Sequence, residues 1–272
     1  MNQTLLITSI APPIDQKNSI DEIKYNWQNL CIKSWQVAGH DILSINTISE
    51  ISVLKNIYTN INFEEAFRST FNINNRNLIF ISDALYFAKL KNYKRIAISN
   101  ADVLITTNVS KLESELYKDN LFYSHRLNID DIYSSSGELF TGIDYCNMSN
   151  QLANSLPESY FAFGLPWWDY WIPYYCLSNN KLISQLTDSD NQPILLHKKH
   201  KDVWSPSDLC IMGKHFFNLC SNNGLINIRS NGLLTLYNEF DFNLNYHKVH
   251  FYAKLAQTSC GFIRESSNIY KL

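Results

Sequence analysis

The chain has 272 residues, of which 45% are hydrophobic and 18% charged, and this is enough to bury a full core within one domain. Its formal net charge of -2 at pH 7 excludes a strongly basic surface, so nucleic acid is a poor candidate for the main partner. A small or neutral polar substrate fits this composition better.

The first predicted elements are a strand and a helix. The apolar run over residues 4–10 predicts a buried strand, which Pro12 and Pro13 end. The segment Ser19-Ile20-Asp21-Glu22 has the pattern of a capping box and predicts the start of a helix. Gly39 is expected to end this helix, whose apolar residues follow at three- and four-residue spacing, at Ile23, Trp27, Leu30 and Cys31.

The same alternation continues through the first half of the chain. Residues 41–46 predict a second strand, and Thr47-Ile48-Ser49-Glu50 is another capping box, before a helix that continues over residues 51–58. The other elements expected here are a short strand at 61–63, a helix at 82–90 and an apolar strand at 95–99. Strands that alternate with helices indicate a mostly parallel sheet covered by helices.

The second half has shorter predicted strands. They are expected at residues 121–128, 142–148 and 193–197, with an aromatic block at 160–175. Helices are expected from Pro206 to about residue 220 and over residues 242–256. We therefore predict one α/β domain over residues 1–272.

Neither the cysteines nor the N-terminus indicates an extracellular protein. The six cysteines include no C-x-x-C pair, so they are expected to be reduced thiols. The N-terminus lacks the basic and long apolar regions of a signal peptide, and no stretch approaches 18 apolar residues. We expect a cytoplasmic protein, with peripheral contact to a membrane left open.

Ligands of open α/β sheets bind at the carboxyl ends of the strands, so the residues after each strand are candidate site residues. Thr8 and Ser9 end the first predicted strand, and the loop they lead into could hold a base or a ribose; a plain turn is the alternative. Asn100 and Asp102 follow the strand at residues 95–99. An amide and a carboxylate two residues apart can both face one hard cation, Mg²⁺ or Mn²⁺, although a turn or a helix cap would use the same residues.

An aromatic segment later in the chain surrounds one carboxylate. Trp167, Trp168 and Trp171 offer flat rings on which a sugar acceptor could stack, beside Asp169. Partial desolvation among indoles would raise the pKa and the basicity of Asp169. The alternative is a Trp-rich core at a helix start, in which Asp169 only caps or forms a pair.

The helix at residues 82–90, the strand after it and Asn100-Ala101-Asp102 together resemble the core of GT-A glycosyltransferases, in the nucleotide-diphospho-sugar transferase superfamily. In that family an Asp near the start of the helix helps to hold the nucleotide-sugar, and a D-x-D at the strand end binds the metal and the diphosphate. Asp83 and Asp102 match these places. Asn100 occupies the position at which the family has the first Asp of the D-x-D motif.

The resemblance extends over about residues 4–205 and implies further site residues. The segment around Asp169 resembles the one in which an acid before the acceptor helix is the base of inverting members. A late His is often a further metal ligand in the family, which implies His197 or His200, with Lys198 or Lys201 near the diphosphate. Taken alone, histidines in a basic loop are more often simply solvated.

The resemblance implies a Rossmann-like GT-A domain in which residues 1–105 bind the nucleotide-sugar and residues 106–272, with the C-terminal helices, bind the acceptor. It implies a metal-dependent glycosyltransferase that moves a sugar to a hydroxyl of a carbohydrate or glycolipid, in glycan or polysaccharide biosynthesis. Arg126 and Asp144 are interpreted as ordinary salt-bridge residues and are not assigned to the site.

Two alternatives remain at this stage. A non-catalytic carbohydrate-binding protein would use the three tryptophans as a platform. A sugar nucleotidyltransferase normally needs a glycine-rich loop after the first strand, whereas residues 8–16 contain no glycine. The sequence also lacks the glycine-rich motifs that cradle phosphates, so a metal and side chains are expected to neutralise a diphosphate.

Overall fold

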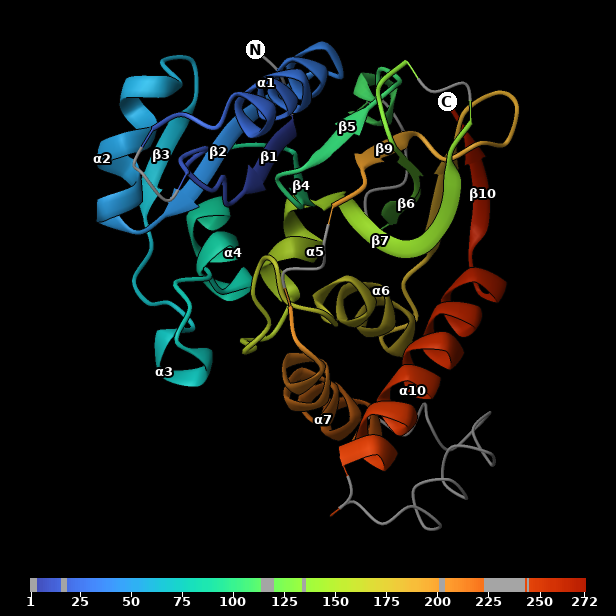
Figure 1. Cartoon of the computed structure of the whole chain (residues 1–272). Helices are drawn as coiled ribbons and strands as arrows, with labels where there is room; N and C mark the ends of the chain where they lie inside the picture. Colours follow the sequence, from blue (N-terminus) through green and yellow to red (C-terminus); the bar gives the residue numbers. More distant parts are fainter. Residues whose placement is uncertain are drawn as a thin grey trace.

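The computed structural model describes residues 4–15, 19–113, 120–133, 136–200, 204–222, 243 and 245–272. Within them, a ten-stranded sheet has the order β10-β8-β6-β7-β4-β1-β2-β3, and β9 joins it by pairing with β5 and β6. Six of the nine pairings between these described strands are parallel. Helices flank the sheet, as Figure 1 shows, and the predicted α/β fold class with a mostly parallel mixed sheet is confirmed.

Parallel strands form the N-terminal half of the sheet: β1 (Thr4–Thr8), β2 (His40–Asn46), β3 (Asn62–Glu65) and β4 (Arg95–Ser99). Leu6 of β1 lies between Ile42 of β2 and Ala97 of β4. All residues of β1 and β4 are buried, as expected for parallel strands covered on both faces. The prediction for residues 95–99 is confirmed, whereas the first strand ends two residues earlier than predicted, at Thr8.

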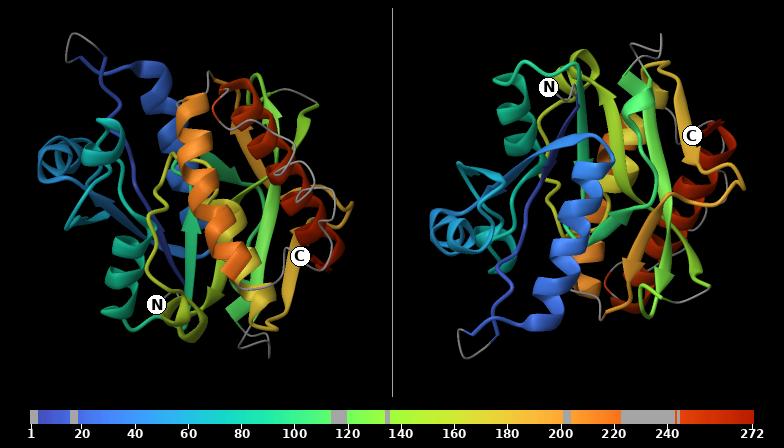
Figure 2. Two further views of the ribbon diagram at one scale, coloured as in Figure 1. Left: turned by 90° about the horizontal axis from the view of Figure 1, so that it is seen from below. Right: turned by 90° about the horizontal axis from the view of Figure 1, so that it is seen from above.

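Alternate residues of β1 face two separate hydrophobic clusters. Leu5 and Ile7 belong to the larger cluster, and Leu6 belongs to the smaller one together with Ile32 and Trp35 of α1. Figure 2 shows α1 on one face of the sheet and α7 and α10 on the other. The helices of the first half are α1 (Glu22–Val37), α2 (Ile48–Ile57), α3 (Phe71–Asn74) and α4 (Ile81–Lys89).

The second half of the sheet is built around β7 (Glu138–Ser149), which pairs antiparallel with β4 and with β6 (Leu121–Ile129). The other strands are β5 (Val103–Ile105), β8 (Ile183–Thr187), β9 (Leu195–Lys198) and β10 (Asn268–Lys271). The helices are η1 (Ser110–Glu113), α5 (Asn150–Ser155), α6 (Trp168–Ser178), α7 (Pro206–Asn222) and α10 (Asn245–Glu265). The predicted helix start at Pro206 is confirmed, while β8 and β10 were not predicted.

The two predicted capping boxes have different outcomes. Before α2, the Glu50 carboxylate accepts a hydrogen bond from the Thr47 backbone N–H at 3.1 Å, so this capping box is confirmed. Before α1, the cap is Asp21, whose carboxylate accepts from two backbone N–H groups of the first turn. Ser19 instead donates its backbone N–H and its hydroxyl to Asp15, so the prediction of Ser19 as the cap is wrong.

The shifted start of α1 also changes its buried face. Ile23 is 68% exposed, and the core side of the helix consists of Gln28, Cys31, Ile32 and Trp35. Gly39 has a φ of 97° directly after the helix, as expected for a residue that ends it.

The predicted tryptophan platform is buried in the core. Trp167, Trp168 and Trp171 are 0%, 2% and 3% exposed. The Trp167 ring stacks on Phe216 of α7 at 5.0 Å, and its Nε1 donates to the carbonyl oxygen of Leu209 at 2.9 Å. These indoles have no exposed face for a sugar, because they fill the space between α6 and its neighbouring helices; the alternative of a Trp-rich core therefore holds.

All six cysteines are free thiols, and only Cys210 among them is not fully buried. No helix of the described residues combines the length and the apolar character that crossing a membrane requires.

Replacement of Trp168 tests this packing. Trp168→Ala should lower the free energy of unfolding by about 3–5 kcal/mol, because it leaves a cavity in the core. Equilibrium unfolding in urea measures the change. Tyr133→Ala, which removes a ring that is 92% exposed, should change it by no more than about 0.5 kcal/mol. Equal effects of the two substitutions would contradict the burial of Trp168.

Candidate metal centre and its polar network

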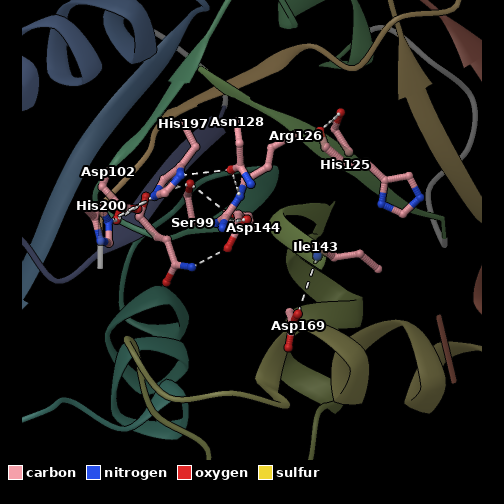
Figure 3. A network of polar contacts seen from close by, with 12 residues as sticks. Ser99, Asp102, His125, Arg126, Asn128, Ile143, Asp144, Asp169, His197 and His200 are labelled. Carbon is pink, nitrogen blue, oxygen red and sulfur yellow. Dashed lines mark hydrogen bonds and ion pairs between the residues drawn. The ribbon is translucent and has the colours of Figure 1, made fainter. Parts of the chain in front are cut away.

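Three predicted site residues meet at the turn between β4 and β5. His200 Nε2 lies 3.0 Å from Asp102 Oδ2, His197 Nε2 lies 3.3 Å from the same oxygen, and the two Nε2 atoms are 3.1 Å apart. The reason is strand pairing: β5 runs antiparallel to β9 with Val103 opposite His197. Figure 3 shows the three side chains pointing toward one another.

The donor atoms of this triad suit a divalent transition metal. Ligand atoms bound at about 2.0–2.2 Å to one metal lie about 3 Å apart when they are adjacent in its coordination sphere, and the observed separations match this. Two imidazoles and one carboxylate are the donors that Mn²⁺, Fe²⁺ and Zn²⁺ accept, whereas Mg²⁺ prefers oxygen. The potential ligand atoms of Asp102, His197 and His200 all lie within 4.8 Å of one another.

Helix α1 fixes the backbone that carries Asp102. The carbonyl oxygen of Asp102 accepts a hydrogen bond from Trp27 Nε1 at 2.9 Å. The carbonyl oxygens on either side accept from Gln28 Nε2 at 2.7 Å and from Trp35 Nε1 at 2.8 Å. Trp27 was predicted only as an apolar helix position, and no local pattern indicates this use of its N–H group.

Asn128 orients His197. Asn128 of β6 lies opposite His197 in the parallel pairing with β9, and its Oδ1 is 3.1 Å from His197 Nδ1. The same oxygen accepts from Arg126 Nε at 3.0 Å. An amide oxygen can only accept, so Nδ1 donates to it, and this holds the ring with Nε2 toward Asp102 and His200.

The two histidines lower the pKa of the Asp102 carboxylate. Burial raises the pKa of Asp102, but hydrogen bonds from His197 and His200 and their charges outweigh burial and hold this pKa well below its usual range.

Asn100 does not join Asp102 at the triad. Its amide donates to Asp144 Oδ1, and the other oxygen of Asp144 accepts from Arg126. The Asn100 backbone N–H and the Ser99 hydroxyl both donate to the carbonyl oxygen of Asp144, at 3.1 and 3.0 Å. Asp144 and Arg126 were not assigned to the site, yet they connect Asn100 with Asn128 and the triad.

Asp169 lies apart from the triad, on the far side of Asp144 and close to Ile143 (Figure 3). It is in the first turn of α6, where its carboxylate accepts from the Trp167 backbone N–H at 3.1 Å and from the Ile143 N–H at 3.5 Å. Burial raises its pKa to about 7, and the charge of Asp144 adds to this effect. The expected rise in the pKa of Asp169 is therefore present.

The other predicted residues are placed elsewhere. Thr8 is buried at the end of β1, and its hydroxyl has no hydrogen-bond partner within the described residues; Ser9 is half-buried. Asp83 is buried and accepts from Arg68 Nε at 2.9 Å, so it does not belong to the network around Asp102. Lys201 lies outside the described residues.

Comparisons with known proteins add structural matches only. No family model and no curated protein matches the chain. A Desulfovibrio desulfuricans G20 protein, provisionally described as a nucleotide-diphospho-sugar transferase, matches at 10% identity with a TM-score of 0.40 over 100% of both chains. The inositol-1-phosphate CTP transferase from T. maritima matches at 10% identity with a TM-score of 0.43, over 76% of this chain and 91% of that one.

A third match is the 4-diphosphocytidyl-2C-methyl-D-erythritol synthase from Anaerococcus prevotii DSM 20548, at 9% identity and a TM-score of 0.40, over 70% of this chain and 91% of that one. Of these three matches, the Desulfovibrio desulfuricans G20 protein carries the description of the superfamily that the sequence resembles. At such identities and TM-scores they carry no argument about activity, and the fold assignment rests on the strand order of the chain itself.

The raised pKa of Asp169 predicts a pH dependence of stability. The folded state keeps a proton that the unfolded state loses near pH 3.8, so stability from Asp169 is present below that pH and is lost as the pH rises to about 7. Asp169→Asn should therefore flatten the fall in the free energy of unfolding between about pH 4 and 7. Urea unfolding across this range measures it. Asp190→Asn, at an exposed carboxylate, should keep the wild-type slope, and identical slopes in both variants would contradict the assignment.

Proposed function

We propose that the chain is a metal-dependent glycosyltransferase that uses a nucleotide-sugar donor. The observation that carries this proposal is the meeting of Asp102, His197 and His200 at the carboxyl end of β4. Ligands of open α/β sheets bind at this edge, and a metal held by these three residues could also bind oxygens of a diphosphate.

Each residue has a defined task in this proposal. Asp102, His197 and His200 hold the metal, with Mn²⁺ favoured over Mg²⁺ by the two imidazoles. When bound, the metal offsets the negative charge that grows on the leaving diphosphate. Thr8 ends β1 with a buried hydroxyl that has no partner within the described residues, and the half-buried Ser9 follows it in the loop that the donor nucleotide would contact.

Asp169 is the proposed base. Its pKa of about 7 makes it a better proton acceptor than an ordinary carboxylate, and a large fraction is ionised near neutral pH. An acceptor hydroxyl would give its proton to a carboxylate oxygen of Asp169 as the hydroxyl oxygen attacks the anomeric carbon of the donor sugar.

Burial weighs against one of the two alternatives. The hypothesis of a carbohydrate-binding protein depended on a tryptophan platform, and the three indoles are buried. A sugar nucleotidyltransferase is kept as the second candidate and is ranked lower, because such enzymes normally need a glycine-rich loop after the first strand, whereas residues 8–16 contain no glycine.

Replacement of Asp102 by alanine tests the proposed binding of the metal and of the donor nucleotide together. A nucleotide bound with Mn²⁺ at about 100 times its Kd stabilises the folded state by about 2.7 kcal/mol, which raises the unfolding midpoint. We expect such a metal-dependent shift with one of UDP, GDP, CMP and dTDP, and its loss in Asp102→Ala. The bond between the Asp102 carbonyl and Trp27 survives this substitution, since it uses the backbone.

Asp130→Ala is the matched control, because Asp130 is an exposed carboxylate outside the triad. Nucleotide and Mn²⁺ should raise the unfolding midpoint of Asp130→Ala as much as that of the wild type. A shift of wild-type size in Asp102→Ala would contradict the metal site, and no shift with any nucleotide would contradict the proposed donor class.

Asp169→Asn tests the base. General-base catalysis contributes about 10²–10⁴-fold, so transfer from the nucleotide-sugar chosen by the binding screen should fall by at least about 100-fold. The thermal shift with the nucleotide and Mn²⁺ should stay unchanged, because Asp169 lies apart from the triad. Transfer at the wild-type rate would exclude this role, and Asp190→Asn serves as the control.

A further inference from the structure

A cavity of about 500 Å³ lies beside the outer face of α4, away from the triad. Its wall combines aromatic rings and charged groups, from Phe67, Arg68, Asp83, Tyr86, Lys89 and Glu158. None of the three metal-ligand candidates lines it. Asp83, which was predicted to hold the nucleotide-sugar, does.

The aromatic side of the cavity has two exposed rings, those of Phe67 and Tyr86. Phe67 stacks on Phe87 with the ring centroids 5.1 Å apart and an angle of 12°, and Tyr86 meets Phe67 edge-on at 5.0 Å. Phe87 is buried, but Phe67 is 65% and Tyr86 46% exposed. Phe67 is therefore held in place by the stacked Phe87 ring, and much of its surface and of the Tyr86 ring stays accessible to a ligand.

The polar side of the cavity is held together by ion pairs and carries no net charge. The Arg68 guanidinium donates to Asp83 at 2.9 Å and pairs with Glu158 at 2.6 Å, and it lies over the Phe80 ring at 5.1 Å. Lys89 adds a second positive charge, so two cations face two carboxylates. Within the described residues, neither the Tyr86 hydroxyl nor the Lys89 ammonium has a hydrogen-bonding partner, so both are available to a ligand.

We propose that this cavity binds a neutral carbohydrate. A sugar ring has an apolar face that stacks on an aromatic ring and hydroxyls that exchange hydrogen bonds with carboxylates, amines and phenols. The balanced charge disfavours a phosphorylated or otherwise ionic ligand, which would meet a like charge. In this arrangement Asp83 is a positioning residue that holds Arg68 against the cavity wall. The inference does not depend on the proposed transfer reaction.

Binding of neutral tetrasaccharides to the full chain tests this proposal. The probes are cellotetraose, maltotetraose and chitotetraose, followed by saturation-transfer NMR and by isothermal titration calorimetry. At least one should bind saturably, and Phe67→Ala and Tyr86→Ala should each weaken it by roughly tenfold, because each removes an aromatic contact. Phe71→Ala is the matched control, since Phe71 is 53% exposed but does not line the cavity.

Three outcomes would overturn the proposal. These are the absence of binding of any tetrasaccharide, wild-type affinity in both Phe67→Ala and Tyr86→Ala, and tighter binding of glucose 1-phosphate that Lys89→Ala abolishes. A self-associating chain that Phe67→Ala converts to a monomer, without saccharide binding, would assign this face to a second copy instead. Asp102→Ala should keep the saccharide affinity, so failure of the metal site and failure of this site are distinguishable.

Discussion

The antiparallel pairing of β5 with β9 is the contact on which the candidate metal centre depends. It places Val103 opposite His197, and so brings the Asp102 carboxylate to an imidazole from a distant part of the chain. On the other side, Trp27, Gln28 and Trp35 of α1 donate hydrogen bonds to three successive carbonyl oxygens around Asp102. A turn that is held from both sides keeps its side chain in place before any ligand arrives, which lowers the cost of binding.

Two carboxylates in the same region have contrasting surroundings. Asp144 is paired with Arg126 and accepts a hydrogen bond from Asn100. Asp169 accepts only backbone N–H groups among the described residues, and burial raises its pKa to about 7. Carboxylates with contrasting surroundings can take different roles in one site. Asp144 connects β7 with Arg126 and Asn100, and Asp169 is a group able to exchange a proton near neutral pH.

Local chemistry explains which parts of this structure could be predicted from the sequence. The run of residues 95–99 and the capping box at Thr47 depend on near neighbours, and both were predicted. The cap of α1 was missed because Ser19 and Glu22 have the spacing of a capping box, whereas Ser19 donates to Asp15 and Asp21 accepts from the N–H groups of Ile23 and Lys24. Asp102, His197 and His200 were reached through family resemblance. The roles of Asp144 and Arg126 depend on the pairing of β7 with β4 and β6, which no local pattern reveals.

The burial of the three tryptophans could not be predicted from the sequence, for a different reason. A sugar platform and a buried helix start both use aromatic side chains beside a carboxylate, so composition cannot separate them. The positive φ of 87° at Trp167 turns the chain into α6 and directs the indole toward Phe216 of α7, a contact that only the tertiary structure defines. At the same time, the exposed rings of Phe67 and Tyr86 come from different segments of the chain and meet only in the folded structure.

Asn128 connects the sheet to the chemistry of the triad. Its oxygen accepts from both Arg126 and His197, which fixes the proton of His197 on Nδ1. Nε2 of His197 then lies 3.3 Å from the Asp102 carboxylate and 3.1 Å from His200 Nε2. A metal ion bound between these atoms would replace the protons that otherwise join them, because metal ligands must be deprotonated. The network that orients His197 therefore directs the nitrogen that would bind the metal toward the centre of the triad, and this is the physical basis of the proposed metal site.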